Sequence, residues 1–314
     1  DHGETPRTHL LKGGRRVDAI KATTEAAANI DHSDEMWFCV HGVHSSGSQS
    51  LGSSPLRILA WTLLRLGSFA YGKRRMERMS ASVPGFVHLH LHTEYSLLDG
   101  GNRVKKLVAR VKELGMDAVA VTDHGNVHAA MEFYHAARAE GIKPILGIEA
   151  YVAADRNGKP GDRLDRTHTG VKDGGFHLVL LAQNLTGWRH LMRLSSDAYA
   201  KGFYYKPRMD KSTLGKWNDG LIAINGHLGS SIASHLTNYV QNNDQEHWIL
   251  AVNEAKWHAE TFGPDEEGKP RFYIELQRHV PEQERINPHL KRLAKELDLP
   301  LIIDNDAHFL TRDD

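Results

Sequence analysis

Imidazole side chains stand where this chain would be expected to form an apolar strand. The stretch at 87–100, VHLHLHTEYSLLDG, places histidines at alternate positions of a strand-like run and ends in Asp99 and Gly100. Alternate residues of a strand point to the same face, so His90 and His92 can bind one cation together. Neutral imidazole is a common ligand of divalent transition metals. The stretch therefore indicates a metal site.

Other candidate ligands stand beside later apolar runs. They are Asp123 and His124 after AVAVT, Glu149 within GIEAY, His177 at the start of FHLVLLAQN, His227 after GLIAIN, and Asp306 and His308 within NDAHF. A carboxylate such as Glu149 costs several kcal/mol to bury unless it is paired or bound to a cation. Taken singly, His177 and His227 are more typical of hydrogen-bonded loop or core histidines than of metal ligands. Taken alone, TDHG at 122–125 is typical of a turn. Their recurrence at equivalent places favours one shared metal site.

Alternating β-rich and helical runs would position these side chains. The strand-like runs lie at 86–92, 117–124, 143–152, 176–184, 220–225, 271–276 and 299–309, and the helical runs at 104–115, 127–140, 185–199, 244–262 and 282–297. This α/β alternation, with continuous apolar strands, is typical of parallel strands covered by helices. Seven units suggest a TIM-like barrel, although an open sheet gives the same pattern. In such barrels the carboxyl ends of the strands build the active site.

The ligand types indicate which metals and which chemistry to expect. Histidines and carboxylates without cysteine suit Zn²⁺, Mn²⁺ or Fe²⁺. The candidates outnumber the roughly four ligands of one zinc ion, so two or three divalent metals are expected. Even with carboxylates from Asp99, Glu149 and Asp306, such a cluster stays positive and attracts phosphate. Neighbouring metals lower the pKa of bound water toward about 7 and stabilise an in-line displacement, which is the chemistry of phosphoester hydrolysis.

The composition limits the other classes of function. The chain has 314 residues, with 39 Lys and Arg against 39 Asp and Glu, so any binding to nucleic acid has to come from a local site. The single cysteine, Cys39, excludes an internal disulfide and favours a cytoplasmic protein. The longest apolar run, at 58–71, contains Arg65 and is shorter than the roughly 20 residues of a membrane span. We therefore expect no membrane partner.

The first part of the chain lacks the pattern of the rest, so we divide the chain into an extension at 1–78 and a domain at 79–314. The extension has a Ser, Gly and His stretch at 41–54 and the basic run GKRRMERM, without a sustained period. It is expected to be disordered or weakly helical, or to be upstream sequence joined in frame, because MSASVPGF at Met79 would make a natural start. An amphipathic helix at 56–75 on a membrane or partner is the alternative.

Four motifs carry a resemblance to a known family. They are HLHLHTEYSLLDG at 88–100, the run from AVAVTDHG to GIEAYVA at 118–153, the run from HLVLLAQN to YYKPRMD at 177–210, and LPLIIDNDAHF at 299–309. These closely resemble the polymerase and histidinol phosphatase (PHP) domain of bacterial replicative DNA polymerase III alpha subunits. The resemblance implies a distorted (βα)7 barrel with a trinuclear site. Its nine ligands would be His90, His92, Asp99, His124, Glu149, His177, His227, Asp306 and His308.

Further roles can be given to single residues. We expect Glu149, Asp306 and His308 to act in catalysis. His88 is expected to be structural, and Asp123 to orient a ligand histidine. In many relatives a cysteine takes the place of His227; since histidine also coordinates, this difference alters metal preference more than it threatens the site.

Basic and aromatic residues are candidates for substrate contacts. The run KGFYYKPRMD at 201–210 offers Tyr204, Lys206 and Arg208, which would hold a phosphate backbone and stack a base. A loop whose tyrosines pack on the barrel is the alternative. Arg189 is a further candidate for phosphate, although a solvated helix face explains it equally well.

The resemblance implies a metal-dependent 3′–5′ exonuclease that proofreads during DNA replication. Its partners would be DNA, replisome subunits and a downstream polymerase palm. Since the family continues for several hundred residues beyond this chain, we expect a fragment that does not polymerise alone. One alternative is a free-standing phosphoesterase of the histidinol-phosphatase type. The run GFYYKPRMD argues against this alternative, because it matches the polymerase relatives. Another is a metal-binding domain that stabilises a polymerase without catalysis.

Overall fold

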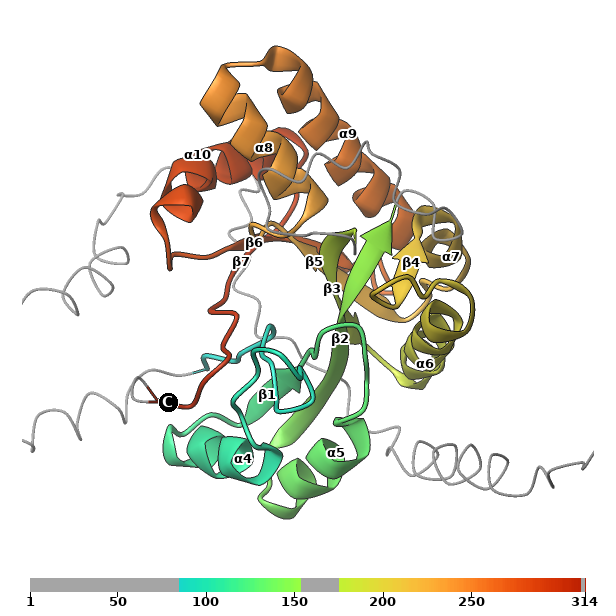
Figure 1. Ribbon diagram of the computed structural model, residues 1–314, viewed down its shortest axis with the longest axis vertical. Helices are drawn as coiled ribbons and strands as arrows, with labels where there is room; N and C mark the ends of the chain where they lie inside the picture. Colours follow the sequence, from blue (N-terminus) through green and yellow to red (C-terminus); the bar gives the residue numbers. More distant parts are fainter. Residues whose placement is uncertain (1–84, 154–174, 312–313) are drawn as a thin grey trace, which may run out of the picture.

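A curved sheet forms a ring with helices around its outside in the computed structural model, which describes residues 85–153, 175–311 and 314 (Figure 1). The strands follow one another around the ring in the order β1, β2, β3, β5, β6 and β7, with β4 added beside β2. Their bounds are β1 (Ala118–Val121), β2 (Lys143–Ala153), β3 (Phe176–Ala182), β4 (Arg208–Asp210), β5 (Leu221–Asn225), β6 (Phe272–Leu276) and β7 (Leu301–Ile303). This confirms the predicted distorted α/β barrel. The predicted extension at 1–78 lies outside the described residues.

An extended segment at 88–92 closes the ring between β1 and the residues after β7. On one side the carbonyl of His88 accepts from the amide of Ala120 at 2.8 Å. On the other side, the amide of His92 donates to the carbonyl of Ala307 at 3.0 Å. The sequence predicts a regular strand here, but the amides of Leu89 and His90 instead donate to the side chain of one carboxylate, Asp304. A side chain therefore replaces a neighbouring strand at the point where the barrel closes.

The strands are not all parallel, which corrects one expectation. β3 runs antiparallel to both β2 and β5, whereas the pairs β1–β2, β5–β6 and β6–β7 are parallel. The amino end of β3 consequently lies at the rim where its neighbours have their carboxyl ends. This reversal explains why His177 opens its strand, while His124 and His227 follow theirs.

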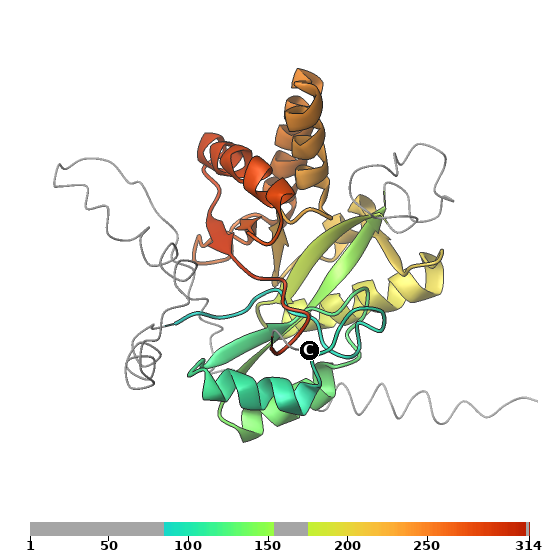
Figure 2. The same ribbon diagram turned by 60° about the vertical axis from the view of Figure 1, so that its left-hand side comes forward.

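The helices pack outside the ring (Figures 1 and 2). Their bounds are α4 (Val104–Glu113), α5 (Ala130–Ala139), α6 (Leu185–Lys201), α7 (Lys211–Lys216), α8 (Ser231–Asn242), α9 (Gln245–Phe262) and α10 (Pro281–Glu296). The sequence reading missed α7 and α8. Both begin at side-chain caps, since Asp210 accepts from the amide of Thr213 and Ser230 from the amide of Ala233. These capping residues were the sequence signal from which the two helices could have been predicted.

The strands are buried on both faces, as their continuous apolar runs predict. Alternate residues such as Val179, Leu181 and Ile224 form one cluster with residues of β1 and β7. Their neighbours, including Leu178 and Leu180, pack against the helices. A wall with apolar contacts on both faces holds the rim in a fixed geometry.

His258 on α9 gives a prediction for acid stability. Its ring stacks between Phe262 and Phe272, and its Nδ1–H donates to the carbonyl of Glu254 at 2.7 Å. Burial lowers the pKa of His258 to about 4, whereas an unfolded histidine titrates near 6.5. Between these values the unfolded chain binds the extra proton, so stability falls as the pH drops from 6.5 to 4, by on the order of 3 kcal/mol.

Urea unfolding with a chelator present checks this prediction for the wild type and for His258→Gln. The stability advantage of the wild type should shrink steadily as the pH falls from 6.5 to 4. An advantage that stays constant over that range would contradict it.

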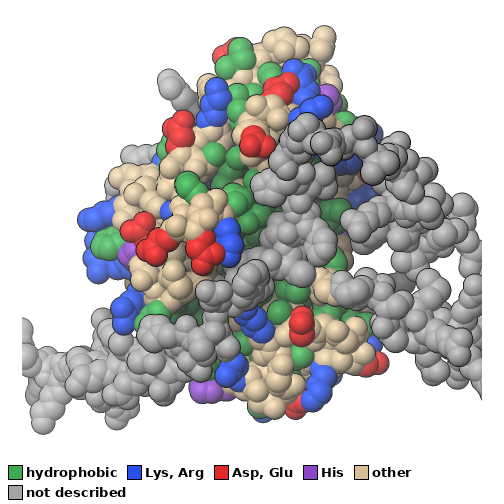
Figure 3. Space-filling model, turned by 180° about the vertical axis from the view of Figure 1, so that it is seen from behind, with side chains coloured by type: hydrophobic (Ala, Val, Ile, Leu, Met, Phe, Trp, Pro, Cys, Tyr) green, Lys and Arg blue, Asp and Glu red, His purple; other side chains and the backbone are tan. Residues whose placement is uncertain are grey.

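The surface has no dominant charge on the face that Figure 3 displays, where acidic and basic side chains are interspersed. Of the helices in the described ranges, none has the length and the mean hydropathy that are needed to cross a membrane.

Candidate metal centre

The nine expected ligands meet at one end of the barrel. They come from the closing segment and its loop (His90, His92, Asp99), from the ends of β1, β3 and β5 (His124, His177, His227), from within β2 (Glu149), and from the turn after β7 (Asp306, His308). The first and last of these lie more than 200 positions apart in the chain. Their meeting depends on the ring closing between β1 and β7.

Glu149 lies at the centre of the group. Its carboxylate oxygens come within 2.5 to 3.5 Å of nitrogens of five histidines: His90, His92, His124, His177 and His227. The side chain is only 2% exposed. A buried carboxylate surrounded by imidazoles is the arrangement expected of a residue that bridges two cations.

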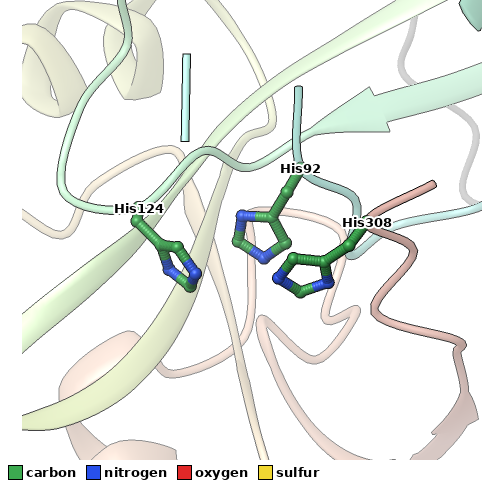
Figure 4. Close-up of side chains that lie close together, drawn as sticks. All are labelled: His92, His124 and His308. Atoms are coloured by element: carbon green, nitrogen blue, oxygen red, sulfur yellow. The ribbon is translucent and has the colours of Figure 1, made fainter. Parts of the chain in front are cut away.

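A second, more exposed part of the site lies beside it. The ring of His92 is flanked by those of His124 and His308, at 4.1 and 4.3 Å between centroids (Figure 4). Asp99 approaches from the loop, with its carboxylate 3.2 Å from Nε2 of His124 and 3.9 Å from Nε2 of His308. Asp99 is 47% exposed, so this side of the site is open to solvent.

The orientation of the imidazoles fits metal binding. In His90 and His308 the Nδ1–H donates outward, to the carboxylate of Glu275 at 3.0 Å and to the carbonyl of Asp306 at 2.9 Å. In His92 it donates to the hydroxyl of Ser96 at 3.0 Å. These bonds fix the tautomers and leave the Nε2 lone pairs for the pocket.

Several buried polar atoms at the site have no hydrogen-bond partner among the described residues. They include Nε2 of His90, His92 and His227 and one carboxylate oxygen each of Glu149 and Asp306. Leaving such atoms unsatisfied is costly, and cations would satisfy them together. Four overlapping groups of three residues have ligand atoms close enough to share an ion. The residues therefore fit a cluster of divalent metals.

Charge coupling in the site points the same way. Burial by itself would lower the pKa of His92, but the nearby carboxylates of Asp306 and Glu149 outweigh it and raise the pKa to about 9. The pKa of His227 also reaches about 9, since Glu149 and Glu275 outweigh its burial. Without metals the carboxylates thus hold protons on the histidines. Metal binding has to displace these protons and becomes tighter as the pH rises.

Glu275 on β6 is a site residue that the sequence reading missed. It is fully buried, its Oε1 accepts from Nδ1–H of His90 at 3.0 Å, and the same oxygen accepts from the side-chain amide of Gln277 at 2.7 Å. Its pKa falls to about 2 because His90 and His227 outweigh the effect of burial. The signal was present in FYIEL, a carboxylate inside an apolar strand, which is the pattern that drew attention to Glu149.

The supporting roles expected of Asp123 and His88 can be placed in the structure. Asp123 accepts from the amide of Thr93 at 2.7 Å and from the hydroxyl of Ser96 at 2.8 Å. It therefore reaches His92 through Ser96. His88 lies outside the cluster, with Nδ1 3.7 Å from the carboxylate of Asp304.

Of the four expected substrate contacts, Lys206 lies nearest the site. Its ammonium group is 3.4 Å from the hydroxyl of Tyr151 and 5.1 Å from the centre of that ring. The ring of Tyr151 in turn lies 5.0 Å from that of His177. Tyr204 is half-buried in the same turn, where its amide donates to the carbonyl of Lys206.

The two arginines are placed differently. Arg208 is 3% exposed and its Nε donates to the carbonyl of Gly202, so the side chain supports the loop instead of facing solvent. Arg189 is exposed, but it lies in the first turns of α6, beside Gly220 at the start of β5. That is the opposite end of the barrel from the metal centre, because β3 runs away from His177 toward α6. Neither arginine side chain faces the metal centre in the structure, so their roles as substrate contacts stay predictions.

Comparison with known proteins agrees with this site. The sequence matches the PHP domain over residues 88–279, which is more than half of the chain. The chain belongs to the PHP family. The matched segment contains seven of the nine candidate ligands, from His90 to His227.

Relatives include DNA polymerase III subunit alpha of Borreliella burgdorferi, 39% identical over 231 residues, and that of Thermus aquaticus, 42% identical over 233 residues. Each alignment covers 73% of this chain and 18% of the relative, so the chain spans about a fifth of the length of these proteins. An amidohydrolase structure from Chromobacterium violaceum is 13% identical to this chain, with a TM-score of 0.42. The superposition covers 71% of this chain and 87% of the amidohydrolase chain. We draw no conclusion from a likeness at this level.

Proposed function

We propose that this PHP domain is a metal-dependent phosphodiesterase that removes nucleotides from 3′ ends of DNA, in the proofreading sense, as part of a replicative polymerase. The observation that carries the proposal is Glu149, a buried carboxylate in contact with five histidines at the rim of the barrel. The choice of DNA as substrate rests on the polymerase relatives. Zn²⁺, Mn²⁺ or Fe²⁺, in two or three positions, suit the ligand set.

The residues of the chain would divide the work as follows. His90, His92, Glu149 and His227 hold the inner part of the cluster, and Asp99, His124 and His308 the outer part, with His177 and Asp306 between them. When bound, divalent cations lower the pKa of water and neutralise charge on the phosphate. The exposed side of Asp99 leaves the outer part accessible to a substrate end. Catalytic roles for Glu149, Asp306 and His308 are part of this proposal.

Asp306 has a backbone feature of its own. Its φ is +47°, in the left-handed region that Asp and Asn tolerate better than most residues. This conformation aims the carboxylate at Nε2 of His90 and His92, at 3.3 and 3.1 Å. Asp306→Asn is therefore a better test variant than Asp306→Ala, because asparagine retains the backbone geometry.

Lys206 is the residue best placed to contact a substrate phosphate. Replacing it with alanine should raise KM about tenfold and leave kcat nearly unchanged, because the lost interaction is a charged hydrogen bond remote from the reacting atoms. Steady-state kinetics on a labelled oligonucleotide measures both constants. Arg189→Ala is the matched control and should change neither, whereas an equal effect of the two variants would contradict the assignment.

The function itself can be tested on a primer with a mismatched 3′ end, annealed to a DNA template. Protein freed of metals with a chelator should become active when Mn²⁺ or Zn²⁺ is returned, shortening the primer by single nucleotides. Asp306→Asn should abolish the reaction. No cleavage by folded, metal-loaded protein would reject the exonuclease.

Two other functions give different results in the same test. Release of phosphate from a monoester, with the primer left intact, would favour a phosphoesterase of the histidinol-phosphatase type. A melting temperature that depends on metal, without hydrolysis of either substrate, would favour a scaffold that stabilises the polymerase. We place the phosphoesterase behind the exonuclease because the relatives are polymerase subunits. We place the scaffold behind it because all nine expected ligand positions are filled.

A further inference from the structure

Two histidines face each other on the outer helical hairpin of α8 and α9, which packs against β5 and β6 outside the barrel wall (Figure 1). His235 lies in α8 and His247 in the first turn of α9. Their Nδ1 atoms are 3.2 Å apart, and the rings are tilted by 35° with 5.5 Å between centroids. Both side chains are half-buried. Neither residue belongs to the metal centre described above.

The separation of the two nitrogens suits a chelate. Zinc binds histidine nitrogen at about 2.0–2.1 Å in tetrahedral geometry, which places two ligand nitrogens about 3.4 Å apart. The observed 3.2 Å is close to that spacing. A direct hydrogen bond between the rings is the competing explanation, and it requires one nitrogen to keep its proton.

The surroundings of His235 favour a neutral imidazole. Burial lowers the pKa of His235, and the neighbouring His247 and Lys211 act in the same direction against Glu254. His235 is therefore uncharged at neutral pH and needs to lose no proton to offer a lone pair. The carboxylate of Glu254 is paired with the ammonium group of Lys211 at 2.5 Å. The same ammonium group also lies over the ring of Trp257. Water, not Glu254, would then fill the remaining positions of a bound ion.

We propose that His235 and His247 form a second, independent site for a divalent cation of the zinc class, which clamps α8 to α9. The site does not depend on the proposed exonuclease. Because the ion binds the folded hairpin and not the unfolded chain, its effect is to stabilise this outer part of the barrel.

Metal content tests the proposal directly. The full chain is dialysed against excess Zn²⁺, freed of unbound ion, and analysed by mass spectrometry of the metal, together with His235→Gln, His247→Gln and the control His135→Gln. His135 is an exposed histidine on α5 without a second histidine beside it. Each variant of the pair should retain one zinc ion fewer than the wild type and the control. Equal zinc content in all four proteins would overturn the proposal.

Hydrogen exchange supplies a second readout that does not rely on the variants being equally stable. In the wild type, Zn²⁺ should slow amide exchange in α8 and in the first turns of α9. In His247→Gln the same addition should slow exchange only around the barrel rim. Exchange in α8 that is indifferent to Zn²⁺ in the wild type would show that the two rings merely share a proton.

Discussion

Replacement of Glu149 by glutamine is expected to empty the metal centre and to lower hydrolysis by a factor of at least about 10³. Glutamine keeps the size of the side chain but replaces a carboxylate oxygen by an amide nitrogen, which cannot bind a cation. Five histidines would then lose the anion around which they are arranged. Loss of several kcal/mol of charge stabilisation corresponds to a rate effect of this size.

Metal analysis and primer hydrolysis on the same preparation measure both consequences. Glu113→Gln is the control, because that carboxylate is exposed on α4, pairs there with Arg110, and is not one of the nine expected ligands. The control should bind metals and hydrolyse DNA like the wild type. A Glu149→Gln protein that keeps its full metal content would mean that Glu149 does not bridge the cluster.

Replacement of Glu275 by leucine is expected to weaken metal binding by roughly 10- to 100-fold, as for other residues that orient ligand histidines. Glu275 is not one of the nine expected ligands, but it accepts from Nδ1–H of His90 and so presents Nε2 to the pocket. Leucine has a similar volume and cannot accept that bond. Hydrolysis at saturating metal should fall much less than metal affinity, because the cluster still forms.

A titration of metal-free protein with Zn²⁺ under competition by a chelator gives the affinity. Glu275→Gln should lie between the wild type and the leucine variant, since the amide oxygen can still accept from His90. If Glu275 had a purely structural role, both variants would lose the same amount of stability. The metal affinity of the folded fraction would then be unchanged.

The convergence of most candidate ligands was predictable because barrel topology brings strand ends together, whereas the full set of nine came from the family resemblance. Most candidates stood at or near an end of an apolar run, and the structure brings all nine to one rim. What this arrangement binds is left to the experiments proposed above. The reversal of β3 was not predictable, because periodicity reports that a strand is buried and not which way it runs. His177 nevertheless fell into place, since its strand begins at the rim.

The supporting residues were harder to find. Asp304 accepts hydrogen bonds from the backbone of the closing segment, and Glu275 accepts one from the side chain of His90. These hydrogen bonds link residues that are 185 to 215 positions apart in the chain. No spacing rule connects residues at that separation. A carboxylate within an apolar strand was the only local signal, and it marked Glu275 as well as Glu149.

The arginines show the limit of reading surface contacts from composition. Arg208 and Lys206 stand two positions apart in the same basic and aromatic run, yet the first is buried against the carbonyl of Gly202 and the second reaches Tyr151. Whether a cation faces the site depends on the path of the turn. Arg189 lies away from the metal centre for a topological reason, because its helix begins at the far end of the barrel.

The location of bound metal tests the central claim most directly. Crystals of the protein soaked in Mn²⁺ should give at least two anomalous scattering peaks at the rim, one of them within about 2.0–2.2 Å of the carboxylate of Glu149 and of Nε2 of a neighbouring histidine. Two peaks on opposite sides of Glu149 would establish it as a bridging ligand. A pocket that contains only water at saturating Mn²⁺ and Zn²⁺ would contradict the account.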